Sequence, residues 1–432
     1  MLLLKFRPFA DEGSFCTIAQ GILLGKKLYT DLFNEKAPLQ YLLTALFMFV
    51  FGETITVTRV VPALSFAAVS GIIAYKLAKG GTSLKLLFLV VLLFIISAIS
   101  MQVFNNTAES SLALIYLSVI LAHGLDPEGP PSHFKTLLVG GMMGLSLGFK
   151  QVAILPLIAL FALTPGNKLK RRYGIGALCG ISIWVFILLL WGNFLDFLWA
   201  GVAFHLGSDV LPTYWRLPFK GDFGGIFLFA LALIPPTIAS LKGDRRVRNI
   251  LIIAVSAFLP FFFRMDAFRL LPAFVLLFLA NVFLWVEGGF SKKAFTLAAV
   301  FTLFASLAFR PFSYWGSFDD YGKLIKTIEE SSLEGAKIWV GPHDPVVYCI
   351  TRREPASRFF FILPWTAKEV VKKELVADFE LKKPALIIDR TDWSPFLPAA
   401  LNEILPQFDE VMDKNYFKIA IFDGAVVYAP KR

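Results

Sequence analysis

The residues best suited to chemistry lie near the N-terminus. Between residues 11 and 36 the sequence holds four carboxylates and three ammonium groups, in surroundings that are almost entirely apolar: Asp11, Glu12, Asp31, Glu35, Lys26, Lys27 and Lys36. A carboxylate can act as a general base, and an ammonium group can stabilise the negative charge on a phosphate. The stretch is either a reaction site held against a membrane or a solvated loop between spans.

Two charged residues farther along are candidates for the same site. Glu109 stands at the expected start of a span, where the helix dipole by itself would also favour a carboxylate. Lys150 lies between two apolar runs, and an ammonium group at membrane depth marks a site by default, with snorkelling to the interface as the alternative. With Lys36 it would form a two-point clamp for a phosphate.

Weaker candidates come from two other segments. Paired with Glu35, His205 would ligate a divalent cation or donate to a phosphate, although a histidine in a loop is more often an ordinary polar residue. Two ligands do not define a metal site, so the sequence requires no cofactor and a divalent cation is only a candidate. Arg269 stands at the expected outer end of a span, where anchoring at the interface is the alternative.

We assign no chemical role to the other polar motifs. The sequence Gly341-Pro342-His343-Asp344-Pro345 predicts a turn between strands. The three cysteines, Cys16, Cys179 and Cys349, are scattered and show no metal-binding spacing. Catalytic triads, CxxC pairs and glycine-rich phosphate loops are absent from the sequence.

The composition indicates a polytopic helical membrane protein. The 432 residues are 56% hydrophobic and 17% charged, whereas soluble domains carry about 25% charged residues. Long apolar runs recur from Tyr41 to Leu307. The net charge of +10 does not indicate a nucleic-acid partner, because the basic residues cluster at the expected ends of helices, where they act as topology signals.

About ten spans are predicted from the length of the apolar runs. They cover roughly residues 55–78, 84–101, 108–124, 136–149, 151–164, 173–191, 223–242, 248–263, 269–286 and 293–309. The run Tyr41–Phe51 is too short to cross a hydrocarbon core of ~30 Å and is predicted to lie at the interface. The Lys- and Arg-rich loops then share the cytoplasmic side, and the candidate site residues share the opposite side.

The expected fold class is therefore mainly α: a membrane helical bundle with a small extracytoplasmic α/β domain. We divide the chain into a first external loop with interfacial helices (1–54), a transmembrane bundle (55–309) and the C-terminal domain (310–432). Five β-type runs are predicted in that domain: Lys337–Val340, Val346–Ile350, Ala385–Asp389, Ile419–Phe422 and Ala425–Tyr428. Two helices are predicted near Tyr321–Ser331 and Ala367–Ala377.

The order of the N-terminal residues resembles a known family. Asp-Glu at residue 11 is followed by Gly-x-x-Leu-Tyr-x-Asp from Gly25, by Glu-Lys-x-Pro-Leu-x-Tyr from Glu35, and then by Phe-Gly and an Arg-led helix. This order resembles the GT-C class of membrane glycosyltransferases, of the protein O-mannosyltransferase and aminoarabinose transferase type. The likeness extends from Asp11 to about Arg269 and is strongest up to Arg59.

The resemblance implies an enzyme of the plasma membrane and cell envelope. It would transfer a sugar from a polyprenyl-phosphate donor to a lipid, glycan or protein hydroxyl on the outer face, with inversion, as in protein glycosylation. Asp11 and Glu109 are then the expected catalytic carboxylates, with Asp11 as the base. The expected substrate-binding residues are Glu12, Glu35, Lys36, Lys150, His205 and Arg269. Membrane lipids and an unidentified acceptor are the other expected partners.

The sequence departs from the family pattern in three places. The first family helix is missing, which we attribute to a truncated or misassigned start. Ala37 stands where a second proline is common, and Ser14 stands where the aminoarabinose branch has an arginine. Two other functions remain open: a transporter or flippase of lipid-linked glycans, and an inactive structural homologue. A transporter would need polar residues at mid-bilayer on several helices, whereas the charges here lie mostly at helix ends.

Overall fold

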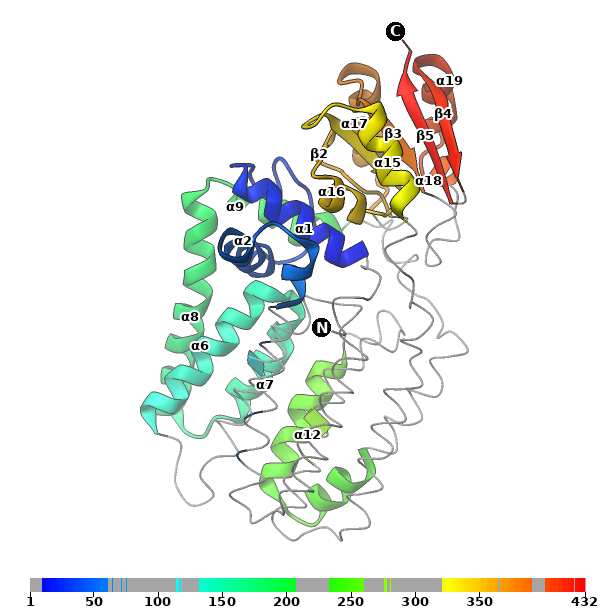
Figure 1. Ribbon diagram of the computed structural model, residues 1–432. Coiled ribbons are helices and arrows are strands. Elements are labelled where there is room, and N and C mark those ends of the chain that lie inside the picture. The colour runs from blue at the N-terminus through cyan, green and yellow to red at the C-terminus, as the bar shows by residue number, and fades with distance from the viewer. Residues whose placement is uncertain are drawn as a thin grey trace. The chain divides into compact units, whose positions relative to one another are not determined.

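The structure is a computed structural model of the whole chain. It describes residues 10–60, 132–206, 233–259, 321–363, 366–390, 401–422 and 424–431, together with a few single residues. The chain divides into two compact units. Figure 1 labels the described helices and strands. Unit 1 combines Met1–Val60, Leu188–Tyr214 and Tyr314–Arg432, and unit 2 combines Val61–Ile187 and Trp215–Ser313.

The N-terminal charged stretch begins as a helix, so the loop expected from residue 11 was wrong for its first half. Helix α1 spans Ala10–Leu23 and starts with Asp11 and Glu12 in its first turn. Carboxylates at that end are favoured by the helix dipole, so the charges that suggested a loop stabilise a helix start. Gly25, with a φ of +82°, follows the helix end in a conformation that favours glycine.

Helix α2 (Leu39–Phe51) covers the run that was predicted to be an interfacial helix. Its buried residues recur at helical spacing and comprise Gln40, Tyr41, Thr44, Ala45 and Met48. Its other face exposes large apolar side chains, among them Phe49 and Phe51. This second apolar face fits the predicted place at a membrane surface. The short 3₁₀ helix η2 (Ile55–Arg59) follows.

Unit 2 contains helices where the sequence predicted spans. The elements are α6 (His133–Phe149), η3 (Gln151–Ala153), α7 (Ile154–Leu163), α8 (Asn167–Leu190, whose last turn belongs to unit 1) and α12 (Arg245–Phe258). Within the described residues, α8 is the one helix long and apolar enough to cross a membrane. The predicted spans 84–101, 269–286 and 293–309, most of 55–78 and 108–124, and the first half of 223–242 lie outside the described ranges.

Glycines bring α6 and α8 into backbone contact. A Cβ added at Gly140 would lie 2.1 Å from the carbonyl oxygen of Tyr173, and one at Gly144 would lie 2.2 Å from that of Ala177. Gly176 approaches the backbone of α6 equally closely. Small residues four positions apart are typical of helices that pack together in lipid, where the hydrophobic effect does not drive helix association.

The C-terminal residues form a five-stranded sheet with the strand order β2-β1-β3-β5-β4. Strands β1 (Lys337–Gly341), β2 (Glu354–Pro355) and β3 (Leu386–Asp389) are parallel, and the hairpin of β4 (Tyr416–Phe422) and β5 (Ala425–Pro430) is antiparallel. The accompanying helices are α15 (Gly322–Ser331), α16 (Val346–Thr351), α17 (Glu369–Leu381), α18 (Leu401–Ile404) and α19 (Phe408–Asn415). Trp339, Phe379 and Phe408 are fully buried between these elements.

Both predicted helices and four of the predicted strands are confirmed in this domain, and Val346–Ile350 is the exception. This run forms helix α16, not a strand. Val346, Val347, Tyr348 and Cys349 are all buried, so no polar face marks the helical period. A short apolar run of this kind cannot be assigned from periodicity alone.

Candidate functional site

Asp11 and Lys36 meet within unit 1. Lys36 Nζ lies 2.8 Å from Asp11 Oδ1, and the two side chains are 23% and 24% exposed. The ammonium group also lies 5.0 Å from the centre of the Phe15 ring, which is a cation–π distance. The pair is therefore supported by protein on one side and accessible to solvent on another, as a site that binds a ligand requires.

The backbone of Lys36 is fixed by Tyr29. The buried Tyr29 hydroxyl donates to the carbonyl oxygen of Lys36 at 2.9 Å, and the Lys36 amide donates to Asn34 Oδ1 at 3.2 Å. Burial raises the pKa of Tyr29 well above its ordinary value, so the phenol keeps its proton and remains a donor. These hydrogen bonds hold the backbone of Lys36, and so the start of its side chain, in the turn that precedes α2.

Helix α9 (Phe194–Gly201) holds this turn from a distant part of the sequence. Asn193, just before α9, donates its side-chain amide to the carbonyl oxygen of Leu28 at 2.8 Å. The Thr30 hydroxyl donates to Asp196 Oδ2 at 2.6 Å. The loop after α1 is therefore anchored by hydrogen bonds and is not merely a solvated connection.

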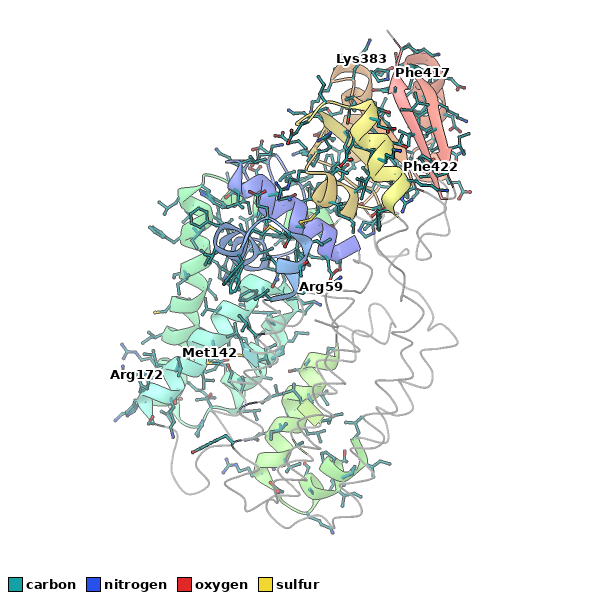
Figure 2. The ribbon with its side chains drawn as sticks, viewed as in Figure 1. Arg59, Met142, Arg172, Lys383, Phe417 and Phe422 are labelled. Carbon is teal, nitrogen blue, oxygen red and sulfur yellow. A yellow bond between two sulfur atoms is a disulfide. The ribbon has the colours of Figure 1, made fainter. Side chains whose placement is uncertain are left out.

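Glu12 is engaged by Arg59 in a bidentate ion pair. Arg59 Nε and one terminal nitrogen each lie 2.8 Å from a different carboxylate oxygen of Glu12, and the side chains are 12% and 3% exposed. Arg59, labelled in Figure 2, is the last residue of η2. Paired, coplanar donors of this kind fix orientation as well as charge. The pair locks the first turn of α1, and hence Asp11, against the segment that follows α2.

The start of α16 packs directly on α1. A Cβ added at Gly13 would lie 2.3 Å from the amide nitrogen of Val346 and 2.7 Å from the carbonyl carbon of Pro345. The Thr17 hydroxyl donates to the carbonyl oxygen of Pro345 at 3.0 Å. Only glycine at residue 13 allows this approach without a shift of backbone. The C-terminal domain and the charged N-terminal helix are therefore one packed body.

A disulfide between Cys16 and Cys349 closes the same interface. It joins residues 333 apart in sequence, and the third cysteine, Cys179, is free and exposed. No spacing signal in the sequence indicates this pairing, because the two cysteines belong to different helices, α1 and α16, that only the tertiary fold brings together. The ion pair between Lys26 and Glu354, at 2.6 Å, reinforces the contact near the other end of α1.

Removal of the disulfide is expected to destabilise unit 1. The variant Cys16→Ser/Cys349→Ser should lose about 2–5 kcal/mol of unfolding free energy, because the unfolded chain regains the freedom that the cross-link removes. Denaturant unfolding followed by tryptophan fluorescence would measure the loss. Cys179→Ser is the matched control and should be unchanged; equal stability of the double variant and this control would contradict the prediction.

His343 lies on the loop between β1 and α16, which the sequence predicted to be an ordinary turn. Its ring packs edge-on against Phe361, with ring centres 5.0 Å apart. Burial removes water from the charged form of the imidazole and lowers its pKa to about 4. The charge of Asp11 raises this pKa, and the charge of Lys36 lowers it. The imidazole is therefore neutral near pH 7 and lies within electrostatic range of the Asp11–Lys36 pair.

A buried ion pair fixes the loop that carries His343. Arg390 Nε lies 3.0 Å from Asp344 Oδ2, with the two side chains 3% and 0% exposed, and the Tyr321 hydroxyl donates to the other carboxylate oxygen at 3.2 Å. The loop follows the carboxyl end of the parallel strand β1. Ligand sites in open α/β sheets occur at such strand ends, and this was the signal in the sequence that could have identified His343.

The structure describes only some of the remaining predicted site residues. Glu35 precedes Lys36 and is partly buried, and Lys150 follows α6 in unit 2, where its amide donates to the carbonyl oxygen of Ser146 at 3.0 Å. Glu109, Arg269 and the side chain of His205 lie outside the described part. In the part that is described, no group of three or more His, Cys, Asp or Glu side chains is arranged to hold a metal ion. The cation at Glu35 and His205 stays a prediction.

Comparisons with known proteins bear on the fold. No protein-family model matches the sequence, and no curated protein matches it. Among solved structures, the chain is similar to ArnT from Cupriavidus metallidurans in the apo state, with a TM-score of 0.65, 14% identity, and coverage of 99% of this chain and 95% of that chain. The same ArnT bound to undecaprenyl phosphate gives a TM-score of 0.63, 14% identity, and 98% and 94% coverage.

An oligosaccharyltransferase from Archaeoglobus fulgidus is a more distant match, with a TM-score of 0.42, 14% identity, and coverage of 99% of this chain and 70% of that chain. The two ArnT structures establish that the chain has the fold of ArnT, an aminoarabinose transferase of the GT-C class. The fold that the N-terminal residue order implied is confirmed.

Proposed function

We propose that this chain, with the fold of ArnT, is a membrane glycosyltransferase centred on the Asp11–Lys36 pair. It would move a sugar from a polyprenyl-phosphate donor to an acceptor hydroxyl. The observation that carries the proposal is the partly exposed carboxylate–ammonium contact of 2.8 Å. A base and a phosphate-binding cation are the two groups that such a transfer needs side by side.

In the reaction, the acceptor oxygen attacks the anomeric carbon of the sugar as the bond from that carbon to the phosphate oxygen breaks. The electron pair of that bond leaves with the lipid phosphate, and Asp11 accepts the proton of the acceptor hydroxyl. Lys36 stabilises the negative charge that develops on the departing phosphate. Attack from the face opposite the phosphate inverts the anomeric configuration.

The ion pair itself suggests how donor binding prepares the base. A phosphate competes with the Asp11 carboxylate for the Lys36 ammonium group, because both have anionic oxygens that accept charge-assisted hydrogen bonds. When the ammonium group turns toward the phosphate, the Asp11 oxygen at 2.8 Å gives up its contact with Lys36, and its place there can be taken by the acceptor hydroxyl. Donor binding would in this way precede and enable proton transfer.

The other predicted residues complete the proposal. Lys150 and Arg269 would add positive charge around the phosphate, and Glu109 would orient the sugar or the acceptor. Glu35 and His205 would contact the substrate. Glu12, which is paired with Arg59 at 2.8 Å, would support the site by holding the start of α1.

The disulfide supports the predicted sidedness. Disulfides persist in oxidising compartments and are rare in the cytosol. Cys16 and Cys349 join α1 to the C-terminal domain, so both elements would face the extracytoplasmic side of the plasma membrane. This is the side that the distribution of Lys and Arg predicts for Asp11 and for the tail.

The test is a transfer assay with the intact chain in proteoliposomes. Radiolabelled polyprenyl-phosphate sugars are supplied with a detergent extract of membranes as the source of acceptors. A transferase releases polyprenyl phosphate and moves the label to another molecule. Label that crosses the bilayer on an uncleaved donor would identify a flippase, and absence of both reactions with a panel of donor sugars would identify an inactive homologue; either result overturns the proposal.

A further inference from the structure

We propose that the C-terminal domain supplies a residue to the transfer site: His343, which hydrogen-bonds the acceptor hydroxyl beside Asp11. The inference rests on the proposed function. It gives the C-terminal domain a part in acceptor recognition and adds a residue that lies more than 300 positions away from Asp11 in the sequence.

The first support is the placement of the loop that carries His343. The loop ends at Pro345 and Val346, whose backbone atoms lie against Gly13, only two residues after Asp11. The disulfide, the hydrogen bond from Thr17 to Pro345 and the buried Asp344–Arg390 pair hold the loop in that place. A histidine on so firmly anchored a loop has a fixed relation to α1.

The second support is the state of the imidazole ring. Phe361 sets its plane, and the side chain keeps some accessible surface. Among the described residues, neither ring nitrogen has a hydrogen-bond partner in the protein. A neutral imidazole has one N–H donor and one acceptor nitrogen, so the partly exposed ring has both functions of a hydroxyl-binding group.

The third support is charge. A protonated His343 would compete with the acceptor for the Asp11 carboxylate and would weaken it as a base. Dense surroundings keep the ring neutral near pH 7, because its pKa is lowered to about 4. A neutral imidazole suits an uncharged hydroxyl better than a second phosphate, and the hydroxyl that must lie beside Asp11 for proton transfer is that of the acceptor.

The critical variant is His343→Phe, which keeps a ring against Phe361 and removes both nitrogens. Transfer of labelled sugar to the membrane extract should fall about fivefold to tenfold, as expected for one lost hydrogen bond. Hydrolysis of the labelled donor without extract and binding of undecaprenyl phosphate should be unchanged. His343→Gln, which retains a donor and an acceptor, should recover part of the transfer, and His133→Phe, on the exposed start of α6, is the control.

Unchanged transfer by His343→Phe would overturn the inference, and so would a parallel loss of transfer, donor hydrolysis and undecaprenyl phosphate binding, which indicates a structural role only. If His343→Phe does not fold, equal transfer by His343→Gln and His343→Ala has the same consequence. These outcomes leave the proposed function intact. That function fails separately if the unaltered chain does not transfer the sugar.

Discussion

Replacement of Asp11 by asparagine should lower the rate of sugar transfer by about 10²–10⁴-fold, which is the contribution of a well-placed general base. Asparagine keeps the size of the side chain and its ability to accept a hydrogen bond from Lys36, but it cannot take a proton. Donor binding should survive, because the Lys36 ammonium group remains. Initial rates of transfer and equilibrium binding of undecaprenyl phosphate measure the two quantities in the same preparation.

Asp31→Asn is the control for this variant. Asp31 belongs to the same acidic stretch and is exposed, and its carboxylate accepts a hydrogen bond from the amide of Lys27 at 2.8 Å. Its amide variant should transfer at nearly the normal rate. If Asp11→Asn also retains turnover, Asp11 is not the base, even if the chain proves to be a transferase.

Replacement of Arg59 by methionine should destabilise the protein by about 3–5 kcal/mol, which is the typical cost of leaving one member of a buried ion pair without its partner. Glu12 is only 3% exposed and receives two hydrogen bonds of 2.8 Å from Arg59. Without these bonds a buried carboxylate loses two charge-assisted hydrogen bonds, and the first turn of α1 loses its tie to η2. Denaturant unfolding would measure the loss.

The double variant Glu12→Gln/Arg59→Met separates the unpaired charge from the lost packing. It contains no unpaired buried carboxylate, so it should recover most of the stability that Arg59→Met loses. A double variant that is as unstable as the single one would show that the arginine acts through its packing. Transfer should follow stability in this series, because Asp11 is adjacent to Glu12 in the first turn of α1.

Much of the fold was predictable because local patterns determine it. The dipeptide Asp423-Gly424 is a hairpin turn signal in the sequence, and the two β-type runs beside it form the β4–β5 hairpin, so the short-range signal and the tertiary structure agree. Apolar runs of sufficient length likewise located α6, α7 and α8. Errors occurred where a pattern has two readings: the acidic start of α1 was taken for a loop, and the wholly buried α16 was taken for a strand.

The site was predictable only on its N-terminal side. Asp11 and Lys36 stand 25 residues apart within one motif, and the turn fixed by Tyr29 brings them into contact. The partners from the C-terminal domain could not be found in this way, because no local pattern encodes the contact of α16 with α1. Only that contact brings Cys349 to Cys16 and His343 within electrostatic range of Asp11 and Lys36.

The most direct test of the account exchanges the two charges of the central pair. The variant Asp11→Lys/Lys36→Asp can still form an ion pair between the same positions, but its base and its cation have changed places. If the pair carries the chemistry, the exchanged chain should lose only about 1 kcal/mol of stability, because a lysine at the start of α1 opposes the helix dipole. It should transfer labelled sugar from polyprenyl phosphate at less than about 1% of the intact rate. Transfer at a rate near that of the intact chain would contradict the account, because it would show that the pair only holds α1 to the turn before α2.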